Sequence, residues 1–287
     1  MRLSAENTAV VLDSTADLPD PAARHANWRL VPLYVRFGDE TFRDHVDLSA
    51  EEFYRRLRAA AVQPTTSQPT PADFAAAFAG LAGYERIVCL TISSKLSGTY
   101  ESARLGASEA GEGKVTVFDS ASASGGIVIL AEAIQRRLER GTSDEEIAEL
   151  VGQFREKSGL LFTVDTLDFL VRGGRVGKAA GLAGELLSVK PILTIAEGEV
   201  RPLKRVRGRR KALAELARLL EERTEDDPRY RLGVAHAHAQ ADADALVARA
   251  RAVRPRCALE VFLTLGPVIG THGGPGTLGL FWFRDPD

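Results

Sequence analysis

The stretch Thr91-Ile-Ser-Ser-Lys-Leu-Ser-Gly-Thr-Tyr100 decides how the first half of this 287-residue chain folds. It follows the apolar run Arg86 to Leu90, which predicts a strand, and it leads into a helical pattern that begins at Tyr100. Ser97 and Gly98 therefore lie at a helix N-terminus, where unpaired N–H groups and the helix dipole favour an anion. Two interpretations are open: Ser97 caps the helix, as serine commonly does, or the junction binds a negatively charged ligand.

The same order of strand, polar loop and helix occurs three times before residue 140. The strands end in Val-Leu-Asp-Ser, Cys-Leu-Thr-Ile-Ser-Ser and Val-Phe-Asp-Ser, and a helical pattern follows each of them. This order predicts a doubly wound α/β sheet of parallel strands. Ligands of such sheets bind at the carboxyl ends of the strands, near a switch in strand order. Asp13, Ser14 and Ser120 are therefore possible rim residues, with helix capping or loop bracing as the alternative for the aspartate.

The segments around this repeat carry strong local signals. Trp28 to Phe37 alternates as a second strand, and Gly38-Asp39 turns it. The prolines of Gln63 to Pro71 exclude a helix, so Thr65, Thr66 and Ser67 are expected in a loop. Helix starts are predicted at Thr70, which is followed by Pro71 and Asp73, and at the capping box Ser143 to Glu146.

A change of pattern near Lys157 to Gly159 predicts two domains. Residues 1–159 are expected to form the parallel α/β domain, and residues 160–287 a two-layer α/β domain with a mixed sheet, because Glu197-Gly198 predicts an antiparallel hairpin. The elements predicted for the second domain are strands at 160–164, 192–195, 200–206, 231–236 and 259–265, helices at 178–187, 209–222 and 241–252, and a glycine-rich loop before the apolar run 278–283.

The composition is that of a globular protein, with 45% hydrophobic and 26% charged residues. A formal net charge of −2 gives no overall attraction to nucleic acid or to anionic membranes. The N-terminus has no apolar signal segment, and no apolar run approaches the ~18 residues that span a bilayer. We therefore expect a cytoplasmic protein without stable membrane insertion. Cys89 and Cys257 are expected to be buried and reduced.

Three familiar motifs do not fit the chain. Gly274 to Gly279 matches G-x-G-x-x-G, but the dinucleotide fingerprint needs a following helix and an acid ~20 residues later. His236 and His238 share one face of a strand, but no third ligand is evident, so no metal site is predicted. Lys95 stands where a nucleophile elbow needs glycine, which argues against Ser97 as a nucleophile.

Two further features are candidates for binding. His272 follows Thr271 in the glycine-rich loop, and it is either a functional histidine or a structural hydrogen-bonding residue. The segment from Arg201 to Lys211 is the densest basic cluster of the chain, and it is either a solvated surface or a docking or phosphate-contacting surface. Arg207, in the turn before a helix, is the member best placed to reach a ligand.

Short segments spread over almost the whole chain share one family pattern. They are Asp13 to Pro19, Thr66 to Pro69, Ser93 to Tyr100, Val117 to Ser120, Arg172 to Arg175, Lys190 to Leu193 and Gly266 to Gly276. This pattern resembles the DegV family of bacterial fatty-acid-binding proteins, which includes the lipid-carrying subunit of bacterial fatty acid kinase. The resemblance implies two α/β domains with a long acyl chain buried between them.

The resemblance also implies a head-group site. Thr66 and Ser97, with Gly98 beside them, would hold the carboxylate, while Thr271, His272 and Arg207 would lie near it. A separate ATP-using kinase subunit would phosphorylate the bound acid, so the chain would be a carrier with no cofactor and no catalytic activity of its own. Burying the tail contributes ~0.8 kcal/mol per methylene, and neutral hydroxyls can satisfy a buried carboxylate.

Two alternatives remain open at this stage. One is a Ser-dependent acyl hydrolase that uses Ser97 and His272. The other is a regulatory or scaffold module that uses the basic cluster. The sequence leaves the length and unsaturation of an acyl chain open, because the volume of a pocket depends on residues that local patterns do not place.

Overall fold

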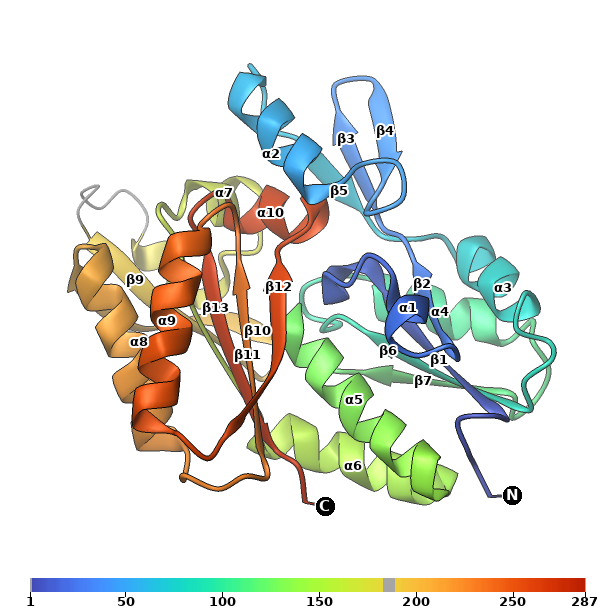
Figure 1. The fold of residues 1–287 in the computed structure, drawn as a ribbon. Helices are drawn as coiled ribbons and strands as arrows, with labels where there is room; N and C mark the ends of the chain where they lie inside the picture. The colour runs from blue at the N-terminus through green and yellow to red at the C-terminus, as the bar shows by residue number, and fades with distance from the viewer. Residues whose placement is uncertain (1, 183–188, 287) are drawn as a thin grey trace.

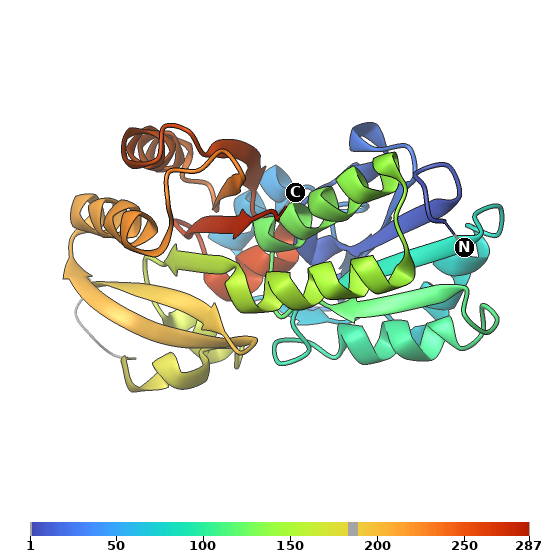
Figure 2. The same cartoon turned by 90° about the horizontal axis from the view of Figure 1, so that it is seen from below.

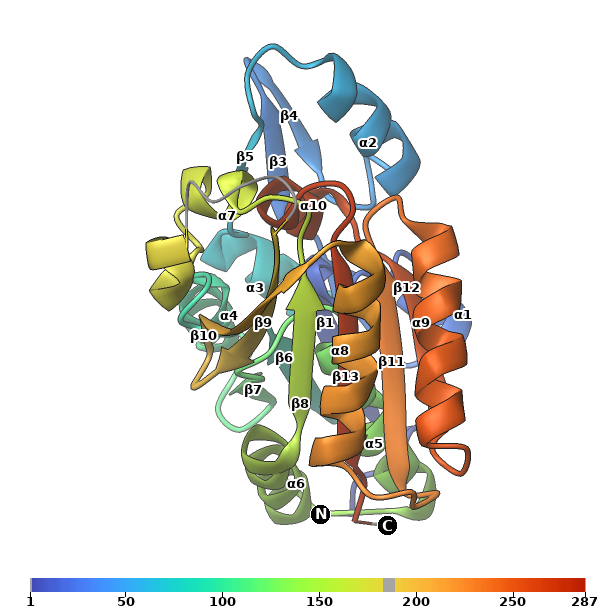
Figure 3. The ribbon, with the colours of Figure 1, turned by 90° about the vertical axis from the view of Figure 1, so that its left-hand side faces the viewer.

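The computed structural model describes residues 2–182 and 189–286 of the chain. Their strands form a four-stranded, a six-stranded and a three-stranded sheet. The two larger sheets lie side by side with helices between them, and the small sheet stands above both (Figures 1 and 3). Both termini lie at the end of the molecule opposite the small sheet.

The four-stranded sheet is parallel throughout and has the order β2-β1-β6-β7, as the repeat of strands and helices predicted. In β1, one of its two central strands, alternate side chains face opposite layers. Ala9 and Val11 pack with one set of helices, and Val10 and Leu12 pack with another. Its strands are β1 (Thr8–Asp13), β2 (Trp28–Val31), β6 (Arg86–Thr91) and β7 (Val115–Asp119), and its helices are α1 (Pro21–Arg24), α3 (Pro71–Ala79), α4 (Thr99–Ala107), α5 (Gly125–Arg140) and α6 (Asp144–Lys157).

The predicted capping signals start two of these helices. The Thr70 side chain accepts from the N–H of Asp73, whose carboxylate accepts in turn from the Thr70 N–H, and Pro71 takes the first helical position of α3. Ser143 and Glu146 form the same reciprocal pair at the start of α6. Local sequence therefore determines where these helices begin.

The prediction of one strand from Trp28 to Phe37 is wrong. Pro32 has no N–H to donate, and the chain leaves the first sheet there to enter the small antiparallel sheet, of order β4-β3-β5. The predicted loop at Thr65 to Ser67 is in fact the third strand of that sheet, because the neighbouring prolines exclude a helix but not a short edge strand. The elements of this region are β3 (Tyr34–Phe37), β4 (Glu40–Arg43), β5 (Thr65–Ser67) and α2 (Ala50–Ala59).

The six-stranded sheet is mixed, as predicted. Its order is β10-β9-β8-β13-β11-β12, and within it only β11 and β12 pair in parallel. One face packs on α8 (Arg209–Arg223) and α9 (Gln240–Val253). Helix α5 covers the other face and so lies between the two larger sheets (Figure 2). The strands are β8 (Gly159–Thr163), β9 (Val189–Ala196), β10 (Glu199–Arg207), β11 (Tyr230–His236), β12 (Ala258–Thr264) and β13 (Leu278–Arg284). A domain boundary between residues 159 and 160 remains a proposal.

Two connections differ from expectation. The predicted glycine-rich loop contains a short helix, α10 (Pro267–Gly273), which starts on a proline and ends at Gly274, whose φ is +75°. An unpredicted helix, α7 (Asp168–Arg172), follows β8. Of the helix predicted at 178–187, the described part belongs to a short 3-10 helix at Gly177–Leu182, and residues 183–187 lie outside the described residues.

Candidate functional site

An apolar cavity of about 350 Å³ is lined by residues of the small sheet, the six-stranded sheet and the segments that follow strands of the four-stranded sheet. Thr15 enters its wall from the 3-10 helix Ser14–Ala16 that follows β1, and Ile92 enters from the loop that follows β6. These are the adjacent strands at which the connections of the sheet change direction. The cavity thus lies where doubly wound sheets bind their ligands. Its apolar wall is formed mainly by Leu33, Ile92, Leu96, Leu160, Phe162, Leu170, Ile195, Val200, Leu265, Val268, Ile269 and Phe281.

We call the part of the cavity wall that contains Thr66, Ser97 and His272 the polar end; Thr15, Ser124 and Thr277 are further hydroxyl residues in the lining. Thr66 lies on β5, where it pairs with Val35 of the small sheet, and its Oγ1 lies 2.8 Å from His272 Nε2. Ser97 enters the wall from the loop before α4. These residues come from three separate elements, so the fold brings together the serine, threonine and histidine singled out in the sequence.

His272 is held as a neutral imidazole. Burial, with a further contribution from the positive charge of Arg175, lowers its pKa to about 4. Its Nδ1 is buried without a hydrogen-bond partner among the described residues and faces Gly173, where a Cβ would lie only 2.2 Å from it. The imidazole therefore has one nitrogen engaged by Thr66 and the other enclosed by backbone.

Ser97 contacts both the cavity and the helix. Its Oγ lies 2.8 Å from Thr99 Oγ1 and accepts from the Thr99 N–H at 3.4 Å. Gly98, the residue before α4, is covered by the side chain of Gln68, whose Nε2 donates to the Gly98 carbonyl at 3.3 Å. A Cβ on Gly98 would lie 2.2 Å from Gln68 Oε1, so a larger residue here would displace the glutamine side chain.

A second, polar cavity of about 350 Å³ adjoins the first at this end. The two share Leu96, Ser97, Arg175 and Val200, and the polar cavity is also lined by Gly98, Lys95 and Glu199. Arg175 is held there by donating to the carbonyls of Leu96, at 3.1 Å, and Gly173, at 2.7 Å. The polar cavity beside Ser97 is thus lined by two cationic side chains, Lys95 and Arg175, and one carboxylate, Glu199.

Sequence reasoning did not single out Arg175 or Gln68 as site residues. Both lie in segments that carry the family pattern, Arg172 to Arg175 and Thr66 to Pro69, and that pattern was the available signal. Their proximity to Ser97 depends on contacts across 79 and 30 residues of sequence, respectively, which local patterns do not reveal.

The three possible rim residues support loops and do not line either cavity. Asp13 is fully buried and accepts from the N–H groups of Thr15, at 2.8 Å, and Ile92, at 2.7 Å, and burial raises its pKa to about 6. Ser14 accepts from the Leu33 N–H, and the Ser120 hydroxyl accepts from the Ser122 N–H. Asp13 and Ser14 thereby fix segments that carry the lining residues Thr15, Ile92 and Leu33.

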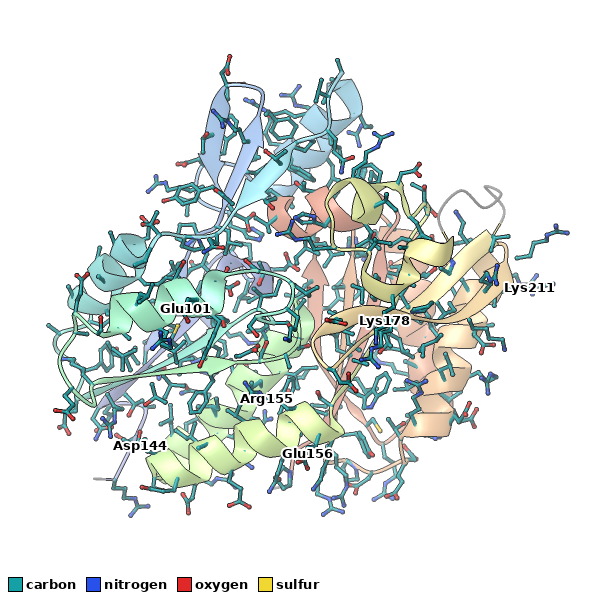
Figure 4. All side chains as sticks on the ribbon, turned by 180° about the vertical axis from the view of Figure 1, so that it is seen from behind. Glu101, Asp144, Arg155, Glu156, Lys178 and Lys211 are labelled. Carbon is teal, nitrogen blue, oxygen red and sulfur yellow. The ribbon has the colours of Figure 1, made fainter. Side chains whose placement is uncertain are left out.

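Two other candidates lie outside both linings. The Thr271 hydroxyl is buried and donates to the Pro267 carbonyl within α10. Arg207 is exposed at one end of β10, whereas Val200, near the other end of that strand, lines both cavities. Beyond Arg207, Lys211 projects away from the body of the molecule (Figure 4). The structure therefore does not bring Arg207 into the candidate site.

The part of the chain that the structure describes contains no group of three or more His, Cys, Asp or Glu side chains suited to a metal ion. His238 instead stacks on Tyr54, with ring centroids 6.0 Å apart. Cys89 and Cys257 are both buried and free. Among the described helices, none has the length and apolar character needed to cross a bilayer.

Comparison with known proteins identifies relatives that match almost the whole length of the chain. A sequence model described as "Uncharacterised protein, DegV family" matches residues 7–285. The "Fatty acid-binding protein" of Thermotoga maritima is 36% identical over 278 residues, covering 94% of this chain and 95% of that protein.

Solved structures agree with this match. A DegV family protein from Thermus thermophilus, described for its fatty acid binding, superposes with a TM-score of 0.89 at 36% identity, covering 97% of this chain and 99% of that chain. The fatty acid kinase (Fak) B3 protein of Streptococcus pneumoniae, loaded with linoleic acid, superposes with a TM-score of 0.84 at 26% identity, covering 97% and 99% of the two chains.

Proposed function

This chain belongs to the DegV family, and on that premise we propose that it binds a long-chain fatty acid, with the acyl tail in the apolar cavity and the carboxylate at Thr66 and Ser97. The observation that carries the proposal is the lining of the cavity, which is mainly aliphatic and aromatic and includes a polar end with the hydrogen-bonding groups of Thr66, Ser97 and His272. An amphiphile with one small polar head matches that distribution.

The apolar wall supports tight binding of the tail. Each methylene removed from water contributes ~0.8 kcal/mol, so a C16 tail gains more than ~10 kcal/mol before the cost of ordering it. Such a gain needs no charged partner for the head group. The head must nevertheless receive hydrogen bonds, since an unpaired buried carboxylate would cancel much of the gain.

The polar end can supply those hydrogen bonds without a permanent ion pair. With its proton on Nε2, the neutral His272 donates to Thr66 Oγ1, which leaves the threonine hydroxyl free to donate to a carboxylate oxygen. Ser97 can donate to the other oxygen, and the first N–H groups of α4 lie directly beyond it. In this arrangement the carboxylate stays ionised and accessible from the polar cavity.

We further propose that this chain presents the carboxylate to a separate ATP-using kinase subunit, which converts it to an acyl phosphate. The polar cavity supports this, because Lys95 and Arg175 line a space beside Ser97 in which a phosphoryl group could be accommodated. The name of the Streptococcus pneumoniae relative supports it as well. The chain would then act in the cytoplasm as a carrier, with catalysis supplied by the partner.

The geometry weighs against the hydrolase alternative. Ser97 Oγ is bonded to Thr99, while His272 Nε2 is bonded to Thr66. A serine nucleophile needs a histidine within hydrogen-bond reach of its own hydroxyl, and here the two side chains engage different partners.

The proposal is tested by the lipid that the protein carries. We expect denaturation and solvent extraction of the purified protein, followed by mass spectrometry, to release long-chain fatty acid. Adding a purified fatty acid kinase subunit and ATP to the loaded protein should then yield acyl phosphate. A protein that is empty and also fails to take up added long-chain acids would overturn the carrier function, whereas binding without phosphorylation would overturn only the kinase step.

A further inference from the structure

One aromatic ring in the wall of the cavity is packed tightly from behind. Phe281, on β13, is 2% exposed and is seated on glycines. A Cβ on Gly125, the first residue of α5, would lie 3.0 Å from Phe281 Cδ2, and a Cβ on Gly279 would lie 2.8 Å from Phe281 Cζ. The ring therefore has the cavity on one side and closely packed backbone on another, which leaves it little room to withdraw.

The strand shows where the cavity ends. Gly279, Phe281 and Phe283 alternate on the same face of β13. The first two line the cavity, whereas Phe283 is fully buried beyond it against Phe154 of α6, with ring centroids 5.1 Å apart. On the neighbouring strand β8, Leu160 pairs with Phe281 and also lines the cavity.

The polar end lies at the start of the same strand. The Thr277 hydroxyl donates to the Gly273 carbonyl, at 2.8 Å, and Gly273 is the residue after His272. From Thr277 to Phe281 an extended strand advances about 13 Å. A tail whose carboxylate is held at the polar end therefore runs along β13 toward the phenyl ring.

We propose that Phe281 is the residue that limits the acyl-chain length this protein accepts. The inference rests on the proposed binding of a fatty acid. Each added methylene improves affinity about fourfold while it is buried. A tail long enough to meet the ring must displace it against Gly125, so the gain stops at that length.

The test is a series of saturated fatty acids of increasing length, with dissociation constants measured for delipidated wild-type protein and for variants. In the wild type we expect affinity to rise with each methylene and then to level off or fall. Phe281→Leu should move this limit to longer acids and improve binding of the first excluded acid at least fourfold. Gly125→Ala, whose Cβ has the Phe281 ring as its nearest neighbour, should push the ring toward the cavity and move the limit to shorter acids.

Phe283→Leu is the matched control, because it removes a buried ring from the same face of the same strand outside the cavity. It should lower the thermal stability without moving the limit. If the length limit is unchanged in Phe281→Leu, this inference is wrong but the proposed function still stands. If Phe281→Leu does not fold, Gly125→Ala provides the same test. If the wild type bound no acid of any length, the proposed function itself would be wrong.

Discussion

At the scale of single residues, the candidate site depends on hydroxyl groups that stay neutral. Thr66 and Ser97 have no charge to attract a carboxylate over a distance, and the nearby imidazole is neutral because burial lowers the pKa of His272 to about 4. Hydrogen bonds to a charged acceptor are stronger than bonds between neutral groups. The carboxylate would thus be held by hydrogen bonds from neutral donors and not by an ion pair.

The first prediction concerns these donors. Ser97→Ala and Thr66→Val should each weaken binding of a long-chain acid about 10- to 100-fold, because a hydrogen bond to a charged group contributes ~1.5–3 kcal/mol. Binding of the methyl ester, which lacks the charge, should change much less. Calorimetric titration with both ligands measures this. Ser108→Ala, at the other end of α4 and outside both cavity linings, is the control. Equal losses for acid and ester would remove the head-group assignment.

The second prediction concerns pH. The pKa of His272 is lowered in the folded protein from 6.5 to about 4, so the unfolded chain binds more protons between these values. The contribution of this group to stability is therefore fully present above pH 6.5 and is lost as the pH falls toward 4, by up to ~3 kcal/mol.

Denaturant unfolding of the delipidated protein at a series of pH values between 7 and 4 measures this dependence. His272→Gln removes the titrating group, and its free energy of unfolding should fall less steeply with decreasing pH than that of the wild type. Parallel curves for the two proteins would show that His272 titrates normally in the folded state.

At the scale of elements, the position of Ser97 depends on how closely α4 packs. Gly106, in the last turn of α4, lies against the start of α3: a Cβ there would be 2.5 Å from the Pro71 carbonyl oxygen and 2.8 Å from Phe74 Cβ. Helix α4 can approach α3 this closely only because the residue has no side chain. This contact fixes the C-terminal end of α4, the helix that begins just after Ser97, against α3.

The third prediction uses this contact. Gly106→Ala should destabilise the protein by ~1–3 kcal/mol, because the added methyl overpacks the interface. Gly152→Ala makes the same change in α6, where an added Cβ meets nothing within 4 Å. It should stabilise the protein by ~0.5–1 kcal/mol through helix propensity. Thermal and denaturant unfolding compare the two variants, and effects of the same sign would contradict the packing argument.

At the scale of the whole molecule, α5 joins the two larger sheets with charge as well as apolar contact. Asp285, which follows β13, is fully buried and pairs with Arg136 Nη2 at 2.7 Å and with Arg137 Nη2 at 3.0 Å. Arg136 also pairs with Glu260 of β12. These ion pairs fix α5, which follows the N-terminal sheet in sequence, onto the strands of the C-terminal sheet.

The fourth prediction follows from this network. Asp285→Asn should cost ~3–5 kcal/mol of stability, because it removes the buried negative charge that pairs with both Arg136 and Arg137. Glu101→Gln breaks the exposed pair with Arg104 instead and should cost no more than ~1 kcal/mol. Unfolding free energies measured at one pH compare the two variants. A loss in Asp285→Asn as small as that in the control would show that this network is not structurally important.

The sequence alone determined the local structure of this protein and its family. Apolar periodicity, capping residues and glycines determine structure within a few neighbouring residues. The parallel repeat, the mixed second sheet and most helix starts could therefore be predicted. The segments that carry the family pattern also indicated Thr66, Ser97 and His272 together, although composition and spacing alone left each of them with a structural alternative.

Only the tertiary structure decided how these residues meet. Thr66 and His272 are 206 positions apart in sequence, and a hydrogen bond joins them only because β5 becomes a strand of the small sheet, beside α10. For the same reason the sequence did not show that Arg207 lies outside both cavity linings or that Phe281 lies in one of them. A cavity is bounded by side chains from elements that are distant along the chain, and its depth depends on their packing, which no local pattern encodes.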